Sequence, residues 1–321
     1  MGPRLQGNSG GEFNSISGGE RGTLGSTIQT LFLPPNTRPS TLLPPFKYFS
    51  SMPLISVIIP TFNRSDLLRR AIDSVLSQSF KDFELIVVND GSTDNTEKTL
   101  AEYNDITLLN LKHNSGVSCA RNRGVKHSGG EWVSFLDSDD QWLPNKLQEQ
   151  VEWMFHTPQC TIFQSREIWI RDGKRVNQPR ALRKKEGDLF FESLQRCSIT
   201  PSTVMIRRSL FEEHGGFDEA LPACEDYDLW LRITASERVG LVDREHLIRY
   251  GGHPDQLSLS TPCLDKYRVY ALQKLLSKEG LNGTQKTATI DTLRKKAAII
   301  VNGALKRGNL NDYQQYIKLT V

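Results

Sequence analysis

The sequence predicts an α/β fold with a mainly parallel central sheet, helices on both faces of the sheet, and a second half of mixed character. Between residues 53 and 143, short apolar runs alternate with segments whose apolar residues recur at helical spacing. Strand–helix alternation of this kind gives right-handed βαβ units and therefore parallel strands. After about residue 156 the alternation weakens, which favours a mixed arrangement there.

The strands expected in the first half are short and apolar. The first, at residues 55–60, is β-branched and continuously apolar, as buried parallel strands are. The helix expected at 64–79 has apolar residues at helical spacing and Asp66 in its first turn, where an acid favours the helix dipole. Further strands are expected at 83–88, 106–111 and 131–136, and further helices at about 95–103 and at 117–127.

The second half has fewer signals. Strands are expected at 161–170 and 202–206, a short helix at 209–214, and an amphipathic helix at 225–233 with an acidic first turn. The residues from 265 to 321 have a helical pattern with many Lys and Arg. We interpret this tail as packing helices, and the alternative is a weak contact with a membrane surface.

Composition excludes several classes of protein. The 321 residues are 37% hydrophobic and 24% charged, as in an ordinary globular protein, and a net charge of +3 does not indicate a nucleic-acid partner. The five cysteines are far apart and form no Cys-x-x-Cys pair, which predicts reduced thiols, a cytoplasmic location and no structural zinc site. We find neither a signal peptide nor an apolar run of ~20 residues, so we expect a soluble protein or a peripheral one at the inner face of the plasma membrane.

Two segments differ from the rest of the chain. Residues 1–51 are rich in Gly, Ser, Thr, Asn and Pro, which predicts disorder, and Met52 just before the first strand suggests that the extension is a start-site or cloning artefact. Residues 171–185 contain seven basic residues and one acid. Such a run is typical of a solvated loop, and the alternative is a surface that binds phosphates or anionic lipid.

Small or acidic residues follow all four strands expected in the first half. In parallel sheets, ligands bind beyond the carboxyl ends of the strands, so these residues predict one shared crevice. The residues are Pro60, Thr61, Asn63 and Arg64 after the first strand, Asp90, Gly91 and Ser92 after the second, Asn114 and Gly116 after the third, and Asp137, Ser138, Asp139 and Asp140 after the fourth.

The three acids after the fourth strand require an explanation. Carboxylates a few ångströms apart raise one another's pKa unless a cation neutralises them. A divalent ion that carries a phosphate-rich ligand is the usual neutraliser, and aspartate oxygens suit Mg²⁺ or Mn²⁺. The alternative is that Ser138 or Asp139 caps a helix beginning near Pro144, which would account for one acid.

These residues resemble the motifs of the family 2 glycosyltransferases, which have the GT-A fold with a Rossmann-like nucleotide half. The resemblance covers residues 54 to about 260 and rests on five motifs in order, at 60–64, 89–94, 116–122, 137–140 and 225–230. It implies a domain at 52–262, with a nucleotide-binding half at 52–143 and an acceptor half at 144–262. The segments 1–51 and 263–321 lie outside it.

The resemblance implies inverting transfer of a sugar from a nucleotide diphosphate sugar, with a UDP-sugar favoured. Asp139 matches the principal metal ligand, Asp137 the acid near ribose and metal, and Asp90 the acid that reads the base edge. Arg121 matches a residue near base or phosphate, and the alternative is a helix-surface arginine paired to an acid. The other residues expected in the nucleotide site are Pro60, Thr61, Asn63, Arg64, Gly91, Ser92, Asn114, Gly116 and Ser138.

The remaining chemistry falls in the acceptor half. Asp226 matches the general base that takes the acceptor proton, Glu225 would orient it, and Asp228 is interpreted as a helix-turn acid. His253 resembles a residue of a loop that closes on the diphosphate and metal, and the alternative is a structural histidine.

The resemblance also bounds the function. The chain lacks the Gln-x-x-Arg-Trp motif of processive synthases, which favours addition of a single sugar in polysaccharide, lipopolysaccharide or glycolipid assembly. The expected acceptor is a glycan or a lipid-linked sugar, with the basic segment at 171–185, including Lys184 and Lys185, or the C-terminal helices as membrane contact. The rivals are a non-catalytic nucleotide-sugar-binding protein and a sugar-phosphate nucleotidyltransferase, although the latter's Gly-rich loop after the first strand is missing.

Overall fold

The computed structural model describes residues 52–252 and 261–321, and in this part of the chain nine strands form one sheet. The strand order is β3-β2-β1-β4-β8-β6-β9-β5, with β7 paired to β6. The strands of the first half are β1 (Ile55–Thr61), β2 (Phe83–Asn89), β3 (Thr107–Asn110) and β4 (Trp132–Phe135), and their pairings with one another are parallel. This confirms the parallel first half.

The second half of the sheet is mixed, as expected. It contains β5 (Gln141–Trp142), β6 (Ile162–Arg171), β7 (Lys174–Val176), β8 (Met205–Arg207) and β9 (Gly240–Gly251). The strand β8 joins the two halves by antiparallel pairing to β4 and β6, whereas β6 and β9 are parallel. The predicted α/β class with a mixed second half is therefore confirmed.

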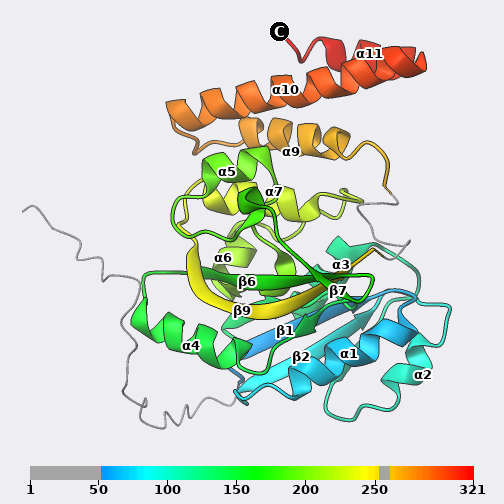
Figure 1. Cartoon of the computed structure of the whole chain (residues 1–321), viewed down its shortest axis with the longest axis vertical. Coiled ribbons are helices and arrows are strands. Elements are labelled where there is room, and N and C mark those ends of the chain that lie inside the picture. The colour runs from blue at the N-terminus through cyan, green and yellow to red at the C-terminus, as the bar shows by residue number, and fades with distance from the viewer. Residues whose placement is uncertain (1–51, 253–260) are drawn as a thin grey trace, which may run out of the picture. The chain divides into compact units, whose positions relative to one another are not determined.

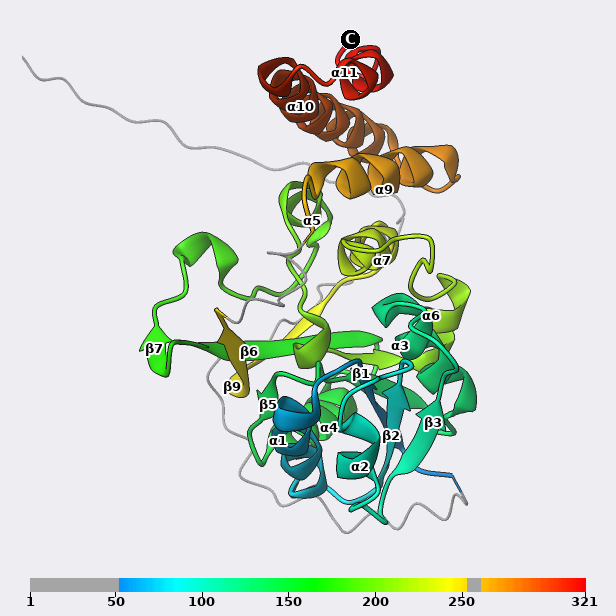
Figure 2. The same cartoon turned by 90° about the vertical axis from the view of Figure 1, so that its right-hand side faces the viewer.

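Helices cover both faces of the sheet because successive side chains of a strand point to opposite sides. On one face, Val57 and Ile59 of β1 pack in a cluster with α1 (Ser65–Leu76) and α4 (Lys146–His156). On the other, Ile58 belongs to a cluster with α3 (Val117–His127) and α7 (Glu225–Thr234) (Figure 2). The remaining elements of the domain are α2 (Thr96–Leu100), α5 (Phe190–Gln195), α6 (Arg208–Glu213) and the 3₁₀ turns η1 (Arg180–Leu182) and η2 (Pro201–Thr203).

The C-terminal tail is helical and packs on α7. It consists of α9 (Asp265–Ser277), α10 (Gly283–Arg307) and α11 (Leu310–Ile317). Leu272 and Leu275 of α9 lie in a buried cluster with Tyr227 and Leu231 of α7, and α10 lies across α9 (Figure 1). These contacts agree with packing helices, and no helix within 52–252 or 261–321 is long and apolar enough to cross a bilayer.

Some element expectations were wrong. The strand expected at 202–206 is divided between η2 and β8, because Pro201 begins a 3₁₀ turn in which Thr203 Oγ1 donates to Thr200 O. The strand β9 was not expected, since charged residues interrupt its apolar pattern and a bulge breaks its register with β6. The helix near Pro144 begins at Lys146 and its N-cap is Asn145, so neither Ser138 nor Asp139 caps it.

Candidate active site

The loops after β1 and β2 are joined to each other at the carboxyl edge of the sheet. The backbone N–H of Asp90 donates to Thr61 O at 2.8 Å, that of Asn63 donates to Ser92 Oγ at 2.9 Å, and Asn63 Oδ1 accepts from Thr93 N at 2.8 Å. Pro60 and Thr61 are buried, and Thr61 Oγ1 has no hydrogen-bond partner among the described residues. The expected nucleotide-site residues of these two strands therefore do come together.

Asp90 shapes the turn that follows β3. Its buried carboxylate accepts the backbone N–H groups of Ser115 and Gly116, both at 2.8 Å. Gly91 packs against the same turn with a φ of +70°, and a Cβ there would lie 2.6 Å from the backbone carbon of His113. Each oxygen of Asp90 keeps a second lone pair, so base recognition by this carboxylate remains a prediction.

Gly116 ends this turn and precedes α3. Its φ is +93°, and within residues 52–252 and 261–321 no atom lies within 4 Å of the position that a Cβ would occupy. Asn114, two residues earlier, is exposed. The backbone here therefore borders open space next to the strand ends.

The turn at residues 137–140 after β4, here called the acid turn, is paired with two arginines. One precedes α1 and the other lies in α3. Asp137 Oδ1 accepts from Arg121 Nη2 at 2.6 Å, and Asp139 Oδ2 accepts from Arg64 Nη1 at 3.0 Å. Ser138, between the two acids, is buried. Burial, together with the charges of Asp139 and Asp137, raises the pKa of Asp140 well above its usual range. The crowding of carboxylates expected from the sequence is thus present.

The acid turn fits a metal ion that arrives with its own phosphate ligands. Within residues 52–252 and 261–321, no three His, Cys, Asp or Glu side chains are grouped so that they could hold a metal alone. Mg²⁺ is usually held by one or two carboxylates together with substrate phosphates. The side chains of Asp137 and Asp139 are 33% and 20% exposed, so both are open to such a ligand. His253, the third expected ligand, lies outside the described residues.

Arg121 connects the acid turn to the start of α7. Its Nη1 donates to Glu225 Oε1 at 2.8 Å while Nη2 binds Asp137, and its side chain is only 4% exposed. The helix-surface interpretation of Arg121 is therefore wrong, although the arginine is indeed paired to acids. Burial and the adjacent charge of Asp226 raise the pKa of Glu225 to about 7, and Arg121 opposes this shift.

Asp226 follows at the second position of α7. The helix starts after Cys224, whose φ of +61° is unusual for a residue with a side chain, and such backbone is often found at functional sites. Asp226 is partly buried, its Oδ1 accepts from Tyr227 N at 2.7 Å, and its Oδ2 accepts from Cys197 Sγ at 3.1 Å. The carboxylate is thus held at both oxygens.

Asp228 has a structural role, as expected. It is buried and pairs with Arg232 at 2.6 Å and with Lys274 of α9 at 3.0 Å. This ion pair attaches α9 to the helix that carries Asp226.

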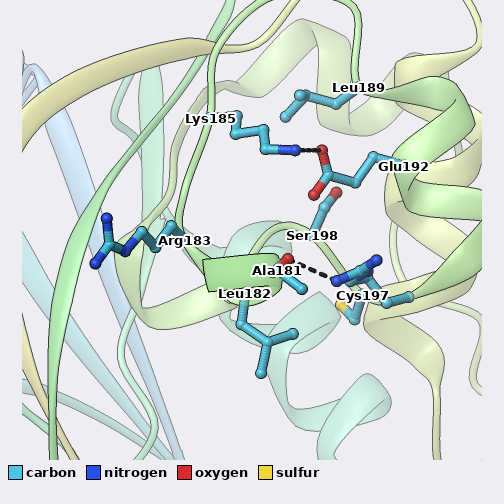
Figure 3. A pocket seen from close by; sticks show the side chains of 9 residues that line it. Ala181, Leu182, Arg183, Lys185, Leu189, Glu192, Cys197 and Ser198 are labelled. Carbon is cyan, nitrogen blue, oxygen red and sulfur yellow. Dashed lines mark hydrogen bonds and ion pairs between the residues drawn. The ribbon is translucent and has the colours of Figure 1, made fainter. Parts of the chain in front are cut away.

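The basic segment is not a uniform surface. Lys184 is buried, its Nζ donates to Thr200 Oγ1 at 2.6 Å, and it lies 3.9 Å from Glu167 Oε2. The expectation that Lys184 contributes to an exposed basic surface is therefore wrong, because its ammonium group is satisfied inside the protein. Lys185 is exposed and pairs with Glu192 at 2.8 Å, beside a cavity of about 10 Å³ that Cys197 also lines (Figure 3).

Sequence reasoning did not find Cys197, Glu167 or Arg249. Glu167 and Arg249 lie on neighbouring strands β6 and β9. Burial opposes the charge of Arg249, but the charges of Glu167, Asp140, Asp137 and Asp226 raise its pKa. The pairing of β9 with β6 and with β5, which the sequence did not predict, brings this cation toward the acids.

Comparison with known proteins gives matches to glycosyltransferases. Residues 56–215 match the family model described as glycosyl transferase family 2. A similar protein from Escherichia coli is the UDP-Glc:alpha-D-GlcNAc-diphosphoundecaprenol beta-1,3-glucosyltransferase WfgD, with 32% identity over 59% of this chain and 73% of that protein. An uncharacterized glycosyltransferase from Rickettsia typhi is 35% identical over 64% of this chain, which spans just 65% of that relative's length.

Solved structures show the same fold at low sequence identity. TarS 1-349 of S. aureus in complex with UDP-GlcNAc has a TM-score of 0.67 at 19% identity, covering 83% of this chain and 81% of that chain. The mannosyltransferase PcManGT from Pyrobaculum calidifontis, in complex with GDP-Man and Mn²⁺, has a TM-score of 0.53 at 19% identity, with coverages of 84% and 83%.

Proposed function

Because this chain belongs to glycosyl transferase family 2, and is thus an enzyme of the transferase class, we propose that it transfers one sugar from a UDP-sugar to an acceptor hydroxyl with inversion. The observation that carries the proposal is the double ion pair of Arg121 with Asp137 and Glu225. It links the acids proposed to hold the leaving group to the helix that carries the proposed base.

The donor nucleotide would lie against the edge formed by β1, β2 and β3. Support comes from the buried, unpartnered Thr61 Oγ1, from the two lone pairs that Asp90 keeps, and from the open space at Gly116. A nucleoside needs hydrogen-bond partners and close approach of backbone, and these three features offer both.

Asp139 and Asp137 would hold a divalent ion, Mn²⁺ or Mg²⁺, together with the donor diphosphate. When bound, such an ion supplies Lewis-acid stabilisation of the charge that develops on the departing diphosphate. Arg64, paired to Asp139 at 3.0 Å, and Arg121, paired to Asp137, hold both carboxylates in place. The buried Asp140 attaches the acid turn to β9, because its Oδ1 accepts from Tyr250 N at 3.3 Å.

Asp226 is proposed as the general base. Inversion requires a base that removes the acceptor hydroxyl proton while the oxygen attacks the anomeric carbon opposite the leaving group. A carboxylate fixed at both oxygens and only partly exposed is suited to this task, because it loses little freedom when the acceptor binds. Glu225, held by Arg121, would fix the first turn of α7 and thus the direction of Asp226.

The acceptor is proposed to be a glycan or a lipid-linked sugar in the assembly of a cell-surface polysaccharide, lipopolysaccharide or glycolipid. The E. coli relative is named for a sugar joined to diphosphoundecaprenol, which makes a lipid diphosphate a reasonable first choice. Exposed basic residues of the 171–185 segment, including Lys185, would attract such a diphosphate or an anionic membrane surface. Lys184 is excluded from this role by its burial.

A donor screen tests the proposal. The full chain is incubated with Mn²⁺ and with UDP-, GDP- or dTDP-sugars, and the released nucleoside diphosphate is measured with and without a GlcNAc-diphosphate-lipid acceptor. We expect UDP release that increases when the acceptor is added. Release of GDP or dTDP alone would contradict the UDP assignment, and no release from any donor would contradict the proposed transfer.

A further inference from the structure

We propose that Cys197 is a positioning residue for Asp226, whose thiol holds one oxygen of the carboxylate so that the other lone pairs face the acceptor. This role rests on the proposed function of Asp226 as the base. The two groups come from different parts of the chain, since Cys197 follows α5 and Asp226 lies in the first turn of α7.

The geometry gives each carboxylate oxygen its own donor. Tyr227 N donates to Oδ1 at 2.7 Å, and Cys197 Sγ lies 3.1 Å from Oδ2. The sulfur lies at the same distance, 3.1 Å, from the backbone carbonyl of Ile199. A thiol has one proton, so it can donate to only one of these oxygens at a time, and a charged carboxylate is the stronger acceptor.

This pair of acceptors suits a base whose charge changes during the reaction. While Asp226 is ionised, the thiol proton points to Oδ2. Once the carboxylate has taken a proton from the acceptor hydroxyl, the thiol proton can turn to Ile199 O, and the sulfur can accept a hydrogen bond from the new carboxylic O–H. Both protonation states of Asp226 therefore keep a partner.

Hydrogen bonds of the residues that follow Cys197 hold the thiol in place. Lys184 Nζ donates to Thr200 Oγ1 at 2.6 Å and to Ser198 O at 3.3 Å, and Ser198 Oγ lies 2.6 Å from Ser193 Oγ of α5. The segment after Cys197 is thus fixed to α5. Tyr227 Oη in turn donates to Leu194 O at 2.7 Å, which fixes α5 to α7.

The thiol keeps its proton in this environment. Burial and the neighbouring charge of Asp226 raise the pKa of Cys197 well above its usual range. The other charged or titratable groups that interact with Asp226 are Glu225 and Cys224 on its own side and Lys184 and Arg249 opposite. Cys197 therefore acts as a neutral hydrogen-bond donor and not as a nucleophile.

A first experiment needs no substrate. The infrared S–H stretching band of Cys197 is identified in the full chain by its loss in Cys197→Ser, and its frequency is then compared between wild type and Asp226→Asn. We expect a shift to higher frequency in Asp226→Asn, because a neutral amide is a weaker acceptor than a carboxylate. An unchanged band would overturn the proposal.

A second experiment uses UDP release from UDP-glucose in the presence of Mn²⁺. Cys160→Ala is the matched control, because Cys160 Sγ also donates to the carbonyl two residues ahead, Ile162 O at 3.3 Å, yet its hydrogen bonds within the described residues go to backbone carbonyls and not to a carboxylate. We expect Cys197→Ala to lower kcat about tenfold with the KM for UDP-glucose unchanged, and Cys197→Ser to restore most of the rate. The acid limb of the rate profile should move to higher pH in Cys197→Ala, since the charged carboxylate loses a donor.

The outcomes separate the two proposals. If wild type releases UDP and Cys197→Ala behaves as Cys160→Ala in kcat and pH profile, the positioning role is wrong while the proposed function stands. If wild type releases no UDP, the proposed function fails for this donor, and the infrared shift still decides whether the thiol holds Asp226. Thermal unfolding of each variant identifies a loss of activity that comes from misfolding.

Discussion

Arg121 and Glu225 are separated by 104 positions in the sequence, yet they form a buried ion pair of 2.8 Å. Nη2 of the same guanidinium binds Asp137 Oδ1 at 2.6 Å. Because guanidinium is planar and presents two parallel donor edges, only arginine can hold both carboxylates in this way. The acid turn after β4 and the first turn of α7 are therefore fixed relative to each other by one side chain.

Replacing Arg121 by alanine should destabilise the protein strongly. The change leaves two carboxylates without their cation, and breaking a buried pair usually costs about 3–5 kcal/mol. Denaturant unfolding at neutral pH measures the loss. Arg69→Ala is the control, because Arg69 pairs with Glu102 at the exposed surface and its removal should change stability far less. Equal losses in the two variants would show that the Arg121 bridge does not stabilise the fold.

Glu225 should make stability depend on pH. Its pKa is raised to about 7 by burial and by Asp226, so the folded state binds its proton more tightly than the unfolded state. The free energy of unfolding contributed by this group is therefore largest below its unfolded value of 4.5 and falls as the pH rises toward 7. Between these limits, the stability of wild type relative to Glu225→Gln should fall by about 1–3 kcal/mol. A difference that stays constant with pH would contradict the raised pKa.

Gly91→Ala should damage the nucleotide edge more than its backbone conformation alone explains. A Cβ at Gly91 would lie 2.6–2.8 Å from backbone atoms of the 113–114 segment, whose turn Asp90 holds. Gly173→Ala is the matched control, because its φ of +72° equals the +70° of Gly91 within a few degrees and no atom of the described residues lies within 4 Å of its Cβ position. We expect Gly91→Ala to lose about 1–3 kcal/mol more and to bind UDP more weakly. Similar losses and unchanged UDP affinity would argue against the close packing.

UDP binding should depend on a divalent ion through Asp139. Calorimetric titration of UDP with Mn²⁺ should give a clear binding isotherm, which weakens when EDTA is added or when Asp139→Asn removes the charge. Asp66→Asn, an exposed acid of α1, serves as a control that should bind as wild type does. Equal UDP affinity with and without the ion would contradict the proposal that a divalent ion takes part in donor binding.

The fold of the first half was predictable because each of its strands and helices has a clear pattern of apolar residues in its own sequence. Buried parallel strands are continuously apolar, so β1, β2 and β4 were found close to their observed bounds, and the acids after β4 followed from strand direction. In contrast, β9 includes Asp243, Arg244 and Glu245, and it is a strand because β6 and β5 pair with it. The local pattern of apolar residues cannot predict a pairing between segments that are far apart in the sequence.

The candidate site shows the same difference between features that are local in the sequence and contacts that depend on the fold. Motifs in the sequence predicted site residues such as Asp90 and Asp226, but not their partners, because a partner depends on which side chains the fold brings together. Arg121 was placed near base or phosphate, which stays a prediction, and its pairing with Asp137 and Glu225 was not identified. Lys184 was assigned to a surface, whereas Glu167 and Thr200 hold it inside. Cys197 gave no signal in the sequence, since a lone cysteine carries no spacing pattern.

The most direct test of the account is Asp226→Asn, measured for UDP release from the donor and for UDP–Mn²⁺ binding in the same preparation. The amide keeps the size of the side chain but cannot take the acceptor proton. We predict that kcat falls by about 100-fold to 10,000-fold while UDP–Mn²⁺ affinity stays at the wild-type value. Transfer at the wild-type rate in Asp226→Asn would contradict the assignment of Asp226 as the base and, with it, the proposed mechanism.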